Sequence, residues 1–179
     1  MFGFEDERLP QHVKLETALG SYAFPTRIVE IGNYIGDYLE AMGKADLATN
    51  FQLGRFSMKL QALERTYIDK VFALCDYYLQ GKSLRYSRHL YDIYKLTPAI
   101  TFNYELVRLI QEIRTHRAKM SICPSAKDGV VVSDIILEFC NNNFYEEDYR
   151  AITSYFAFDY VSYEEVIQTM LTLAQKAIF

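Results

Sequence analysis

Large apolar residues recur at helical spacing along residues 65–79. They fall at steps of three and four, as on one face of an α-helix, and a second set beside them widens that face. Asp69, Asp76 and Gln80 leave only a narrow polar edge. The pattern therefore predicts a helix that is buried over most of its circumference.

A second short helix is predicted to follow this one, after a Gly-Lys-Ser turn at 81–83, and to run to Leu96. The first helix carries Lys70 and the second carries Asp92. A lysine beside an apolar face either extends its ammonium group to solvent along that face or acts at a site. These two residues are the first candidates for chemistry.

Three segments nearer the N-terminus favour β-strands. Residues 12–19 alternate apolar and polar positions, as on a strand with two different faces. Residues 27–31 form a second apolar segment that could pair with the first, and residues 56–63 alternate again. Residues 33–42 predict a short helix, with Gly43 suited to its C-terminal end.

Beyond Leu96 the apolar spacing is helical throughout. Asn103 is a candidate N-cap, and Ser162 with Glu165 forms a capping-box pattern. The predicted helices are 103–120, 132–139, 146–156 and 163–178. The sequence therefore predicts an α+β fold, predominantly α, with short N-terminal strands in residues 1–63 and a helical bundle in 64–179, in one compact domain.

Composition narrows the class of protein. A chain of 179 residues, half of them apolar, is long enough for one domain with a real core. No apolar run approaches the length of a membrane span, and the acidic start lacks the basic region of a signal peptide, so we expect a cytoplasmic protein with no membrane partner. The three cysteines are far apart and predict buried thiols, not a disulfide framework or a zinc site.

Charge is unevenly distributed. Residues 54–127 carry 13 Lys/Arg and 6 Asp/Glu, whereas residues 128–179 carry 2 and 9. A basic middle is what a phosphate-rich ligand requires. The alternative is that helix surfaces simply vary in sign.

The segment around Lys70 and Asp92 resembles two motifs of the AbiEii/AbiGii-type nucleotidyltransferases, toxins of the polymerase-beta-like superfamily. The family has a lysine in a helix of the form E/D-K-hydrophobic-x-A-L, which matches DKVFAL at 69–74. It has an aspartate in R-H-x-Y-D-I/L-Y-x-L, which matches RHLYDIYKL at 88–96. The resemblance covers nearly all of residues 12–179.

The resemblance also implies two motifs that the sequence does not contain. The family holds its triphosphate with a Gly-Ser pair and its Mg²⁺ ions with Asp-x-Asp on the next strand. Gly20-Ser21 is followed by no such pair and is interpreted as a turn. We therefore expect the C-terminal portion of such a protein, with residues 1–63 a strand-containing remnant of the nucleotidyltransferase core, and with Mg²⁺ and NTP implied by the family but metal ligands not in this chain.

Three residues are predicted to be catalytic by this resemblance. Lys70 would contact the nucleotide phosphates as a compact charge. Asp92 would orient Lys70 or assist at the acceptor; otherwise it pairs along its helix with Arg88 or Lys95. Glu16 is the candidate third carboxylate, or else a solvated charge beside Lys14 on a strand edge.

A second group of residues is predicted to bind nucleotide or phosphate. Its members are basic residues near the two motifs and at the end of the 103–120 helix, with one serine that follows it. The alternative for the helix end is a cationic terminus favoured by the helix dipole. The group consists of Arg65, Arg88, Arg114, Arg117 and Ser125.

Two hypotheses of function follow. In the first, the chain is part of a toxin of a toxin–antitoxin or abortive-infection system that transfers a nucleotide from NTP to an RNA acceptor such as tRNA. The resemblance then implies a cognate antitoxin, for which DNA binding is one option, and a separate N-terminal half is another partner that it allows. In the second, it is a non-catalytic RNA- or protein-binding module derived from that family. An inert remnant is a third, weaker idea.

Overall fold

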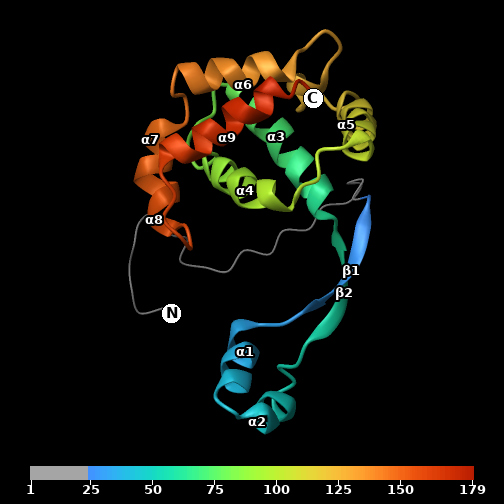
Figure 1. The fold of residues 1–179 in the computed structure, drawn as a ribbon, viewed down its shortest axis with the longest axis vertical. Helices are drawn as coiled ribbons and strands as arrows, with labels where there is room; N and C mark the ends of the chain where they lie inside the picture. The colour runs from blue at the N-terminus through green and yellow to red at the C-terminus, as the bar shows by residue number, and fades with distance from the viewer. Residues whose placement is uncertain (1–23) are drawn as a thin grey trace. The chain divides into compact units, whose positions relative to one another are not determined.

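The computed structural model describes residues 24–179. By their contacts these residues form two compact units, one within 24–62 and the other spanning 63–179. Figure 1 shows the first unit as two long strands with two short helices, and the second as a group of packed helices. The two units are described separately below.

An antiparallel ribbon forms the first unit. Strand β1 (Thr26–Ile31) pairs with β2 (Phe56–Gln61), and the chain between them folds into α1 (Tyr34–Ala41) and α2 (Ala45–Asn50). The side chain of Asn33 caps α1 by accepting a hydrogen bond from Gly36 N at 2.8 Å. The helix expected at 33–42 and the strand expected from Phe56 are therefore present, whereas α2 is an element that no sequence pattern predicted.

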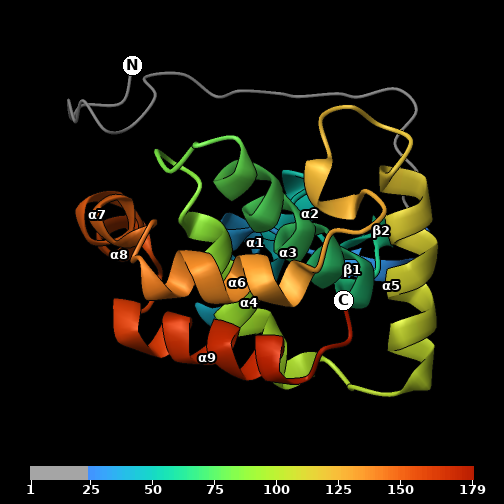
Figure 2. The same ribbon diagram turned by 90° about the horizontal axis from the view of Figure 1, so that it is seen from above.

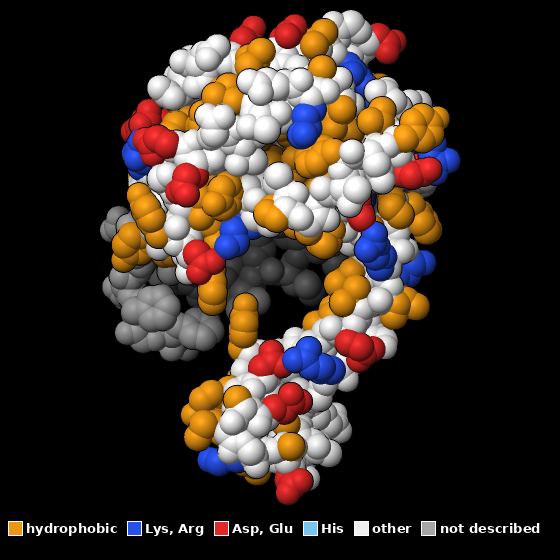
Figure 3. All heavy atoms as spheres, in the orientation of Figure 1, with side chains coloured by type: hydrophobic (Ala, Val, Ile, Leu, Met, Phe, Trp, Pro, Cys, Tyr) orange, Lys and Arg blue, Asp and Glu red, His pale blue; other side chains and the backbone are white. Residues whose placement is uncertain are grey.

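The two faces of this ribbon differ in polarity. Val29 lies opposite Met58 and Ile31 opposite Phe56, which places these four apolar side chains on one face. Val29, Met58 and Phe56 remain exposed. Figure 3 also shows hydrophobic side chains at the surface around α1 and α2, at the bottom of the view. This unit therefore leaves much of its apolar surface uncovered.

The second unit is entirely helical in its regular structure. Three of its shortest elements, η1, η2 and η3, are single 3₁₀ or π turns. The elements in order are α3 (Leu63–Leu79), α4 (Arg88–Leu96), η1 (Thr97–Ala99), α5 (Tyr104–Arg117), η2 (Pro124–Ala126), α6 (Val132–Asn141), α7 (Glu146–Asp148), η3 (Tyr149–Thr153), α8 (Ser154–Phe156) and α9 (Tyr163–Gln175).

Helix α3 is the centre of this unit. It packs against α4, α5, α6 and η2, while α9 packs against α4 and α6. Figure 2 shows α6 and α9 side by side, with α5 along one flank. Ile68, Val71 and Leu74 of α3 are fully buried, and each such side chain contributes about 1.5–3 kcal/mol through burial. The helix predicted to be buried over most of its circumference is the core element of the unit.

The capping predictions are confirmed. Asn103 Oδ1 accepts a hydrogen bond from Leu106 N at 3.0 Å at the start of α5. Ser162 and Glu165 exchange the two bonds of a capping box at the start of α9. The fold is α+β and mainly helical, as the sequence predicts. The strand expected at 12–19 lies outside the described residues.

The cysteines and the helix lengths bear on two further expectations. Cys75, Cys123 and Cys140 are all free thiols and all buried. Within residues 24–179, every helix is too short or too polar to cross a lipid bilayer.

Candidate functional site

Helices α3 and α4 bring together the two residues that the sequence singles out first. Lys70 Nζ lies 2.6 Å from Asp92 Oδ2, although the residues are 22 positions apart in the chain. Both side chains are partly exposed, at 24% for Lys70 and 36% for Asp92. The pair is therefore formed by tertiary packing and is open to a solvent-borne ligand.

His89 is the third member of this cluster. Its Nδ1 lies 3.7 Å from the same Asp92 oxygen, a distance too long for a hydrogen bond, and this buried nitrogen has no hydrogen-bond partner among the described residues. Its ring stacks on Tyr77, with centroids 6.0 Å apart and planes 7° from parallel. Packing therefore fixes the ring beside Asp92.

The environment sets the charges of the cluster. Burial lowers the pKa of His89, against the opposing effect of Asp92. Burial alone would raise the pKa of Asp92, but His89 and Lys70 outweigh it, so this pKa is lowered. At neutral pH the cluster therefore holds an ionised Asp92 beside a neutral His89 imidazole.

The donor set of the described residues does not fit a divalent metal. Mg²⁺ prefers several oxygen ligands, and no group of three or more His, Cys, Asp or Glu residues that could hold a metal occurs in residues 24–179. Asp92 is the carboxylate at this site, and it already forms an ion pair with Lys70. The Mg²⁺ that the family resemblance implies therefore has no ligand set in this part of the chain.

Three residues predicted to bind phosphate lie instead in a buried network. Arg65 Nε donates to Asp69 at 2.8 Å, and Arg117 donates to Asp69 at 3.2 Å and to Asp76 at 2.7 Å. Ser125 donates to Asp76 through both its backbone N–H, at 2.8 Å, and its hydroxyl, at 2.6 Å. A phosphate contact by Arg117 or Ser125 would have to replace these bonds, and the nucleotide-binding role of all three remains a prediction.

The other predicted residues have different surroundings. Arg114 donates to the backbone carbonyls of Lys127 and Val130, and so ties the end of α5 to the following loop. Arg88 begins α4 and is exposed. Glu16 lies outside the described residues. Among the predicted site residues that the structure describes, Lys70 and Asp92 contact each other across α3 and α4, and Arg88 is exposed four residues before Asp92 on α4.

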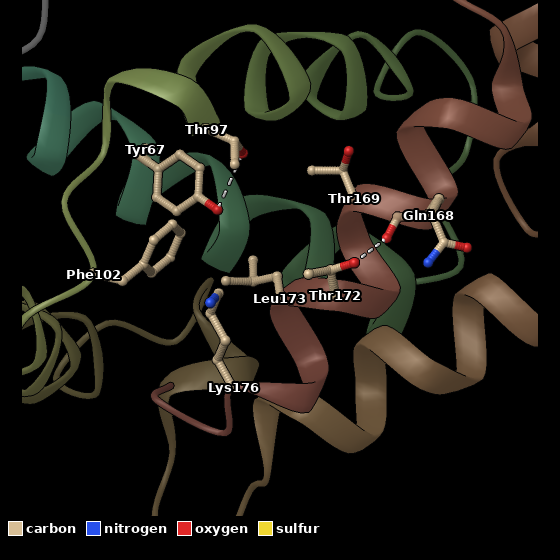
Figure 4. Close-up of a pocket in the computed structure, with 8 residues that line it drawn as sticks. All are labelled: Tyr67, Thr97, Phe102, Gln168, Thr169, Thr172, Leu173 and Lys176. Atoms are coloured by element: carbon tan, nitrogen blue, oxygen red, sulfur yellow. Dashed lines mark hydrogen bonds between the residues drawn. The ribbon is translucent and has the colours of Figure 1, made fainter.

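A separate cavity of about 160 Å³ lies between α9 and the region of η1. Figure 4 shows the Tyr67 hydroxyl and Thr97 on one side, with Leu173 and Lys176 of the α9 end opposite Phe102. Lys176 Nζ lies 4.7 Å from the centre of the Phe102 ring. Its lining includes neither Lys70 nor Asp92, so it is a different feature of the molecule from the paired charges.

Sequence reasoning missed the partners that hold these residues. Asp76 was expected on a polar edge but is buried under Ser125, 49 positions away. Asp148 binds the backbone of the loop that leads into α4, more than 60 positions away. No local pattern could signal either contact, because each joins segments far apart in the chain.

Comparison with known protein families identifies the class of protein. Residues 1–170 match the family described as the nucleotidyl transferase AbiEii toxin of type IV toxin–antitoxin (TA) systems. The chain belongs to this family of nucleotidyltransferase toxins. Membership implies a cognate antitoxin as a partner. No curated protein and no solved structure gives a significant match.

Proposed function

We propose that the chain acts in transferring a nucleotide from an NTP to an RNA acceptor, of tRNA type, with Lys70 and Asp92 in the reaction site. The observation that carries the proposal is the 2.6 Å contact between these two side chains, each of which lies in a segment that resembles a family motif. Glu16, Arg65, Arg88, Arg114, Arg117 and Ser125 remain further candidates.

The chemistry assigns each side chain a role. Transfer joins the α-phosphoryl group of the NTP to an acceptor hydroxyl and releases pyrophosphate. Negative charge accumulates on the phosphate oxygens, where the Lys70 ammonium group would stabilise it. The ionised Asp92 would hold that ammonium group in place and accept a hydrogen bond from the acceptor hydroxyl.

Partners and cofactors form part of the same proposal. NTP and Mg²⁺ are the substrates and metal typical of the family, and the metal ligands would come from outside residues 24–179. A separate N-terminal half is one source of them. We further propose a cytoplasmic location and a cognate antitoxin with a DNA-binding region.

Lys70→Ala and Asp92→Ala test the proposal directly. Each variant should reduce incorporation of labelled nucleotide into tRNA by about 100-fold or more, because one charge-stabilising group is lost. Incorporation is measured with the purified protein. Growth arrest of a strain that expresses the protein without its antitoxin is a second readout.

Lys95→Ala is the matched control. Lys95 also lies on α4 and pairs with an aspartate, Asp159, at 2.8 Å, but on the exposed surface. It should leave incorporation and growth arrest unchanged. Full activity in both Lys70→Ala and Asp92→Ala would show that this pair is not the reaction site.

The second candidate function is a non-catalytic module that binds RNA or protein. It is favoured by the absence of a metal-binding group among residues 24–179 and by the mutual neutralisation of Lys70 and Asp92. A gel shift with tRNA separates the two functions. RNA binding that persists in Lys70→Ala and Asp92→Ala, without any nucleotide incorporation by the wild type, would favour the module.

A further inference from the structure

A buried carboxylate holds the loop that leads into α4. Asp148 Oδ1 accepts a hydrogen bond from Arg85 N at 2.7 Å, and Asp148 Oδ2 accepts one from Ser87 N at 3.1 Å. The Ser87 hydroxyl lies 2.7 Å from that of Thr153. Ser87, Asp148 and Thr153 are all buried, so hydrogen bonds inside the protein hold the part of the loop next to α4 in place.

Arg85 has an unusual backbone in this loop. Its φ is +68°, in the left-handed region that residues other than glycine rarely adopt. Asp148 binds the N–H of this same residue. Local preference alone would place a glycine here, so the arginine side chain is held at this position at a conformational cost.

The side chains that the loop presents are cationic. Arg85 and Arg88 are both exposed, and no carboxylate of residues 24–179 forms an ion pair with either. Glu146, on the neighbouring α7, is bound to Arg150. Two arginines that no described carboxylate pairs with therefore lie three residues apart, in a segment whose backbone Asp148 holds.

The cationic loop continues into the candidate reaction site. Tyr86 of the loop stacks on Tyr77, with ring centroids 3.6 Å apart, and Tyr77 also stacks on His89. Arg88 lies four residues before Asp92 on α4, which places it on the same helical side about 6 Å along the axis. An RNA end held at Asp92 would lie about one helical turn from Arg88, and Arg85 is three residues further back along the chain.

We propose that this loop, residues 82–88, binds the phosphate backbone of the RNA acceptor through Arg85 and Arg88, with Asp148 as the residue that positions it. The proposal rests on the proposed function and adds a binding surface to it. Exposed arginines without counter-ions, beside stacked aromatic rings, favour a polyanion that also carries bases.

The test compares Arg85→Gly, Arg85→Lys and Arg108→Ala in the full chain. Fluorescence anisotropy measures binding of a fluorescein-labelled tRNA transcript over a range of NaCl concentrations. Arg85→Gly should weaken binding several-fold and reduce the slope of log K against log salt by about 1, the value for one phosphate contact. Arg85→Lys should retain most of the affinity, because it keeps the charge.

Folding and function separate in this design. Glycine adopts a positive φ without strain, so Arg85→Gly should have an unchanged or higher melting temperature while it loses RNA affinity. Arg108, on α5, is an exposed arginine paired with Glu105, and Arg108→Ala should bind RNA as the wild type does. Unchanged affinity and salt slope in Arg85→Gly would overturn the proposal.

Two further arms complete the test. Asp148→Asn should weaken RNA binding. In combination with Arg85→Gly it should add little further loss of affinity, because both changes act through the Arg85 side chain. Fully additive losses would refute the positioning role of Asp148. Polyglutamate of matched charge should compete poorly with the tRNA, whereas equal competition would assign the loop to an acidic protein instead. If Lys70→Ala abolishes transfer while Arg85→Gly binds normally, the loop proposal fails and the proposed function stands.

Discussion

The pKa of His89 depends on the groups that surround its ring. Its ring is stacked on Tyr77 and faces Asp92, with Lys70 and Arg88 as the other charged groups nearby. Burial and the two cations disfavour its protonated form, and Asp92 only partly offsets them. The residue is thereby kept neutral next to a carboxylate that is kept ionised.

This state predicts a pH dependence of stability. The pKa of His89 is lower in the folded protein than its ordinary value of 6.5, so the unfolded chain takes up the proton first as pH falls. The free energy of unfolding should therefore decrease as pH drops below about 6.5, towards the folded pKa. Urea unfolding at pH 7 and pH 5 measures it, and His89→Gln should show a smaller decrease.

The Asp92 carboxylate does not interfere with this measurement. Its pKa is lowered from 3.8, so its contribution is present above that value and is lost only at more acidic pH. An identical pH dependence in wild type and His89→Gln would show that the histidine does not titrate differently on folding.

At the scale of elements, one aspartate joins three helices. Asp76 of α3 binds Arg117 of α5 and both donors of Ser125 in η2. Burial of Arg117 is offset by this pairing, and its pKa is raised despite the desolvation that opposes it. The network therefore fixes how α5 and η2 lie against the central helix.

Asp76→Ala should be among the most destabilising single changes in this unit. It removes the acceptor of both donors of the buried Ser125 and leaves the partly buried Arg117 with Asp69 as its remaining carboxylate; breaking such a buried pair costs about 3–5 kcal/mol. Chemical unfolding of the full chain measures the loss. Asp159→Ala, which removes an exposed partner of Lys95, should cost much less, because exposed ion pairs contribute little to stability, and equal losses would contradict the network's role.

At the scale of the whole molecule, local patterns predicted the elements well. Asn103 and Ser162 mark helix starts because a cap is a contact within four residues. The spacing of apolar residues around Ile68 identified the central helix because a buried face repeats with the helical period. The Lys70–Asp92 contact was predicted by a motif resemblance and not by spacing.

Contacts between distant segments were not predictable in this way. Asp76 and Asp148 each satisfy donors from another part of the chain, and their own neighbours carry no sign of it. Helix α2 has only Ala48 buried, so it lacks the apolar periodicity that would have indicated it. Arg85 was not singled out because its backbone conformation is imposed by Asp148 and is not favoured by its own residue type.

The reactivity of the three buried thiols can report local unfolding of the segments that contain them. Cys75 lies in α3, Cys123 just before η2 and Cys140 in α6. Burial raises the pKa of Cys140 to about 12, and the pKa values of Cys75 and Cys123 are raised as well. Because the thiolate is the reactive form, thiol–disulfide exchange at each sulfur must wait for its own part of the structure to open.

Dithionitrobenzoate should therefore react slowly with the native chain and rapidly with all three cysteines in denaturant. Mass spectrometry of partly modified protein would then rank α3, α6 and the η2 segment by how often each opens. A cysteine that reacts at once in the native protein would show that its segment is already open. The reaction rates of these three cysteines thus compare local unfolding at three places in the helical unit.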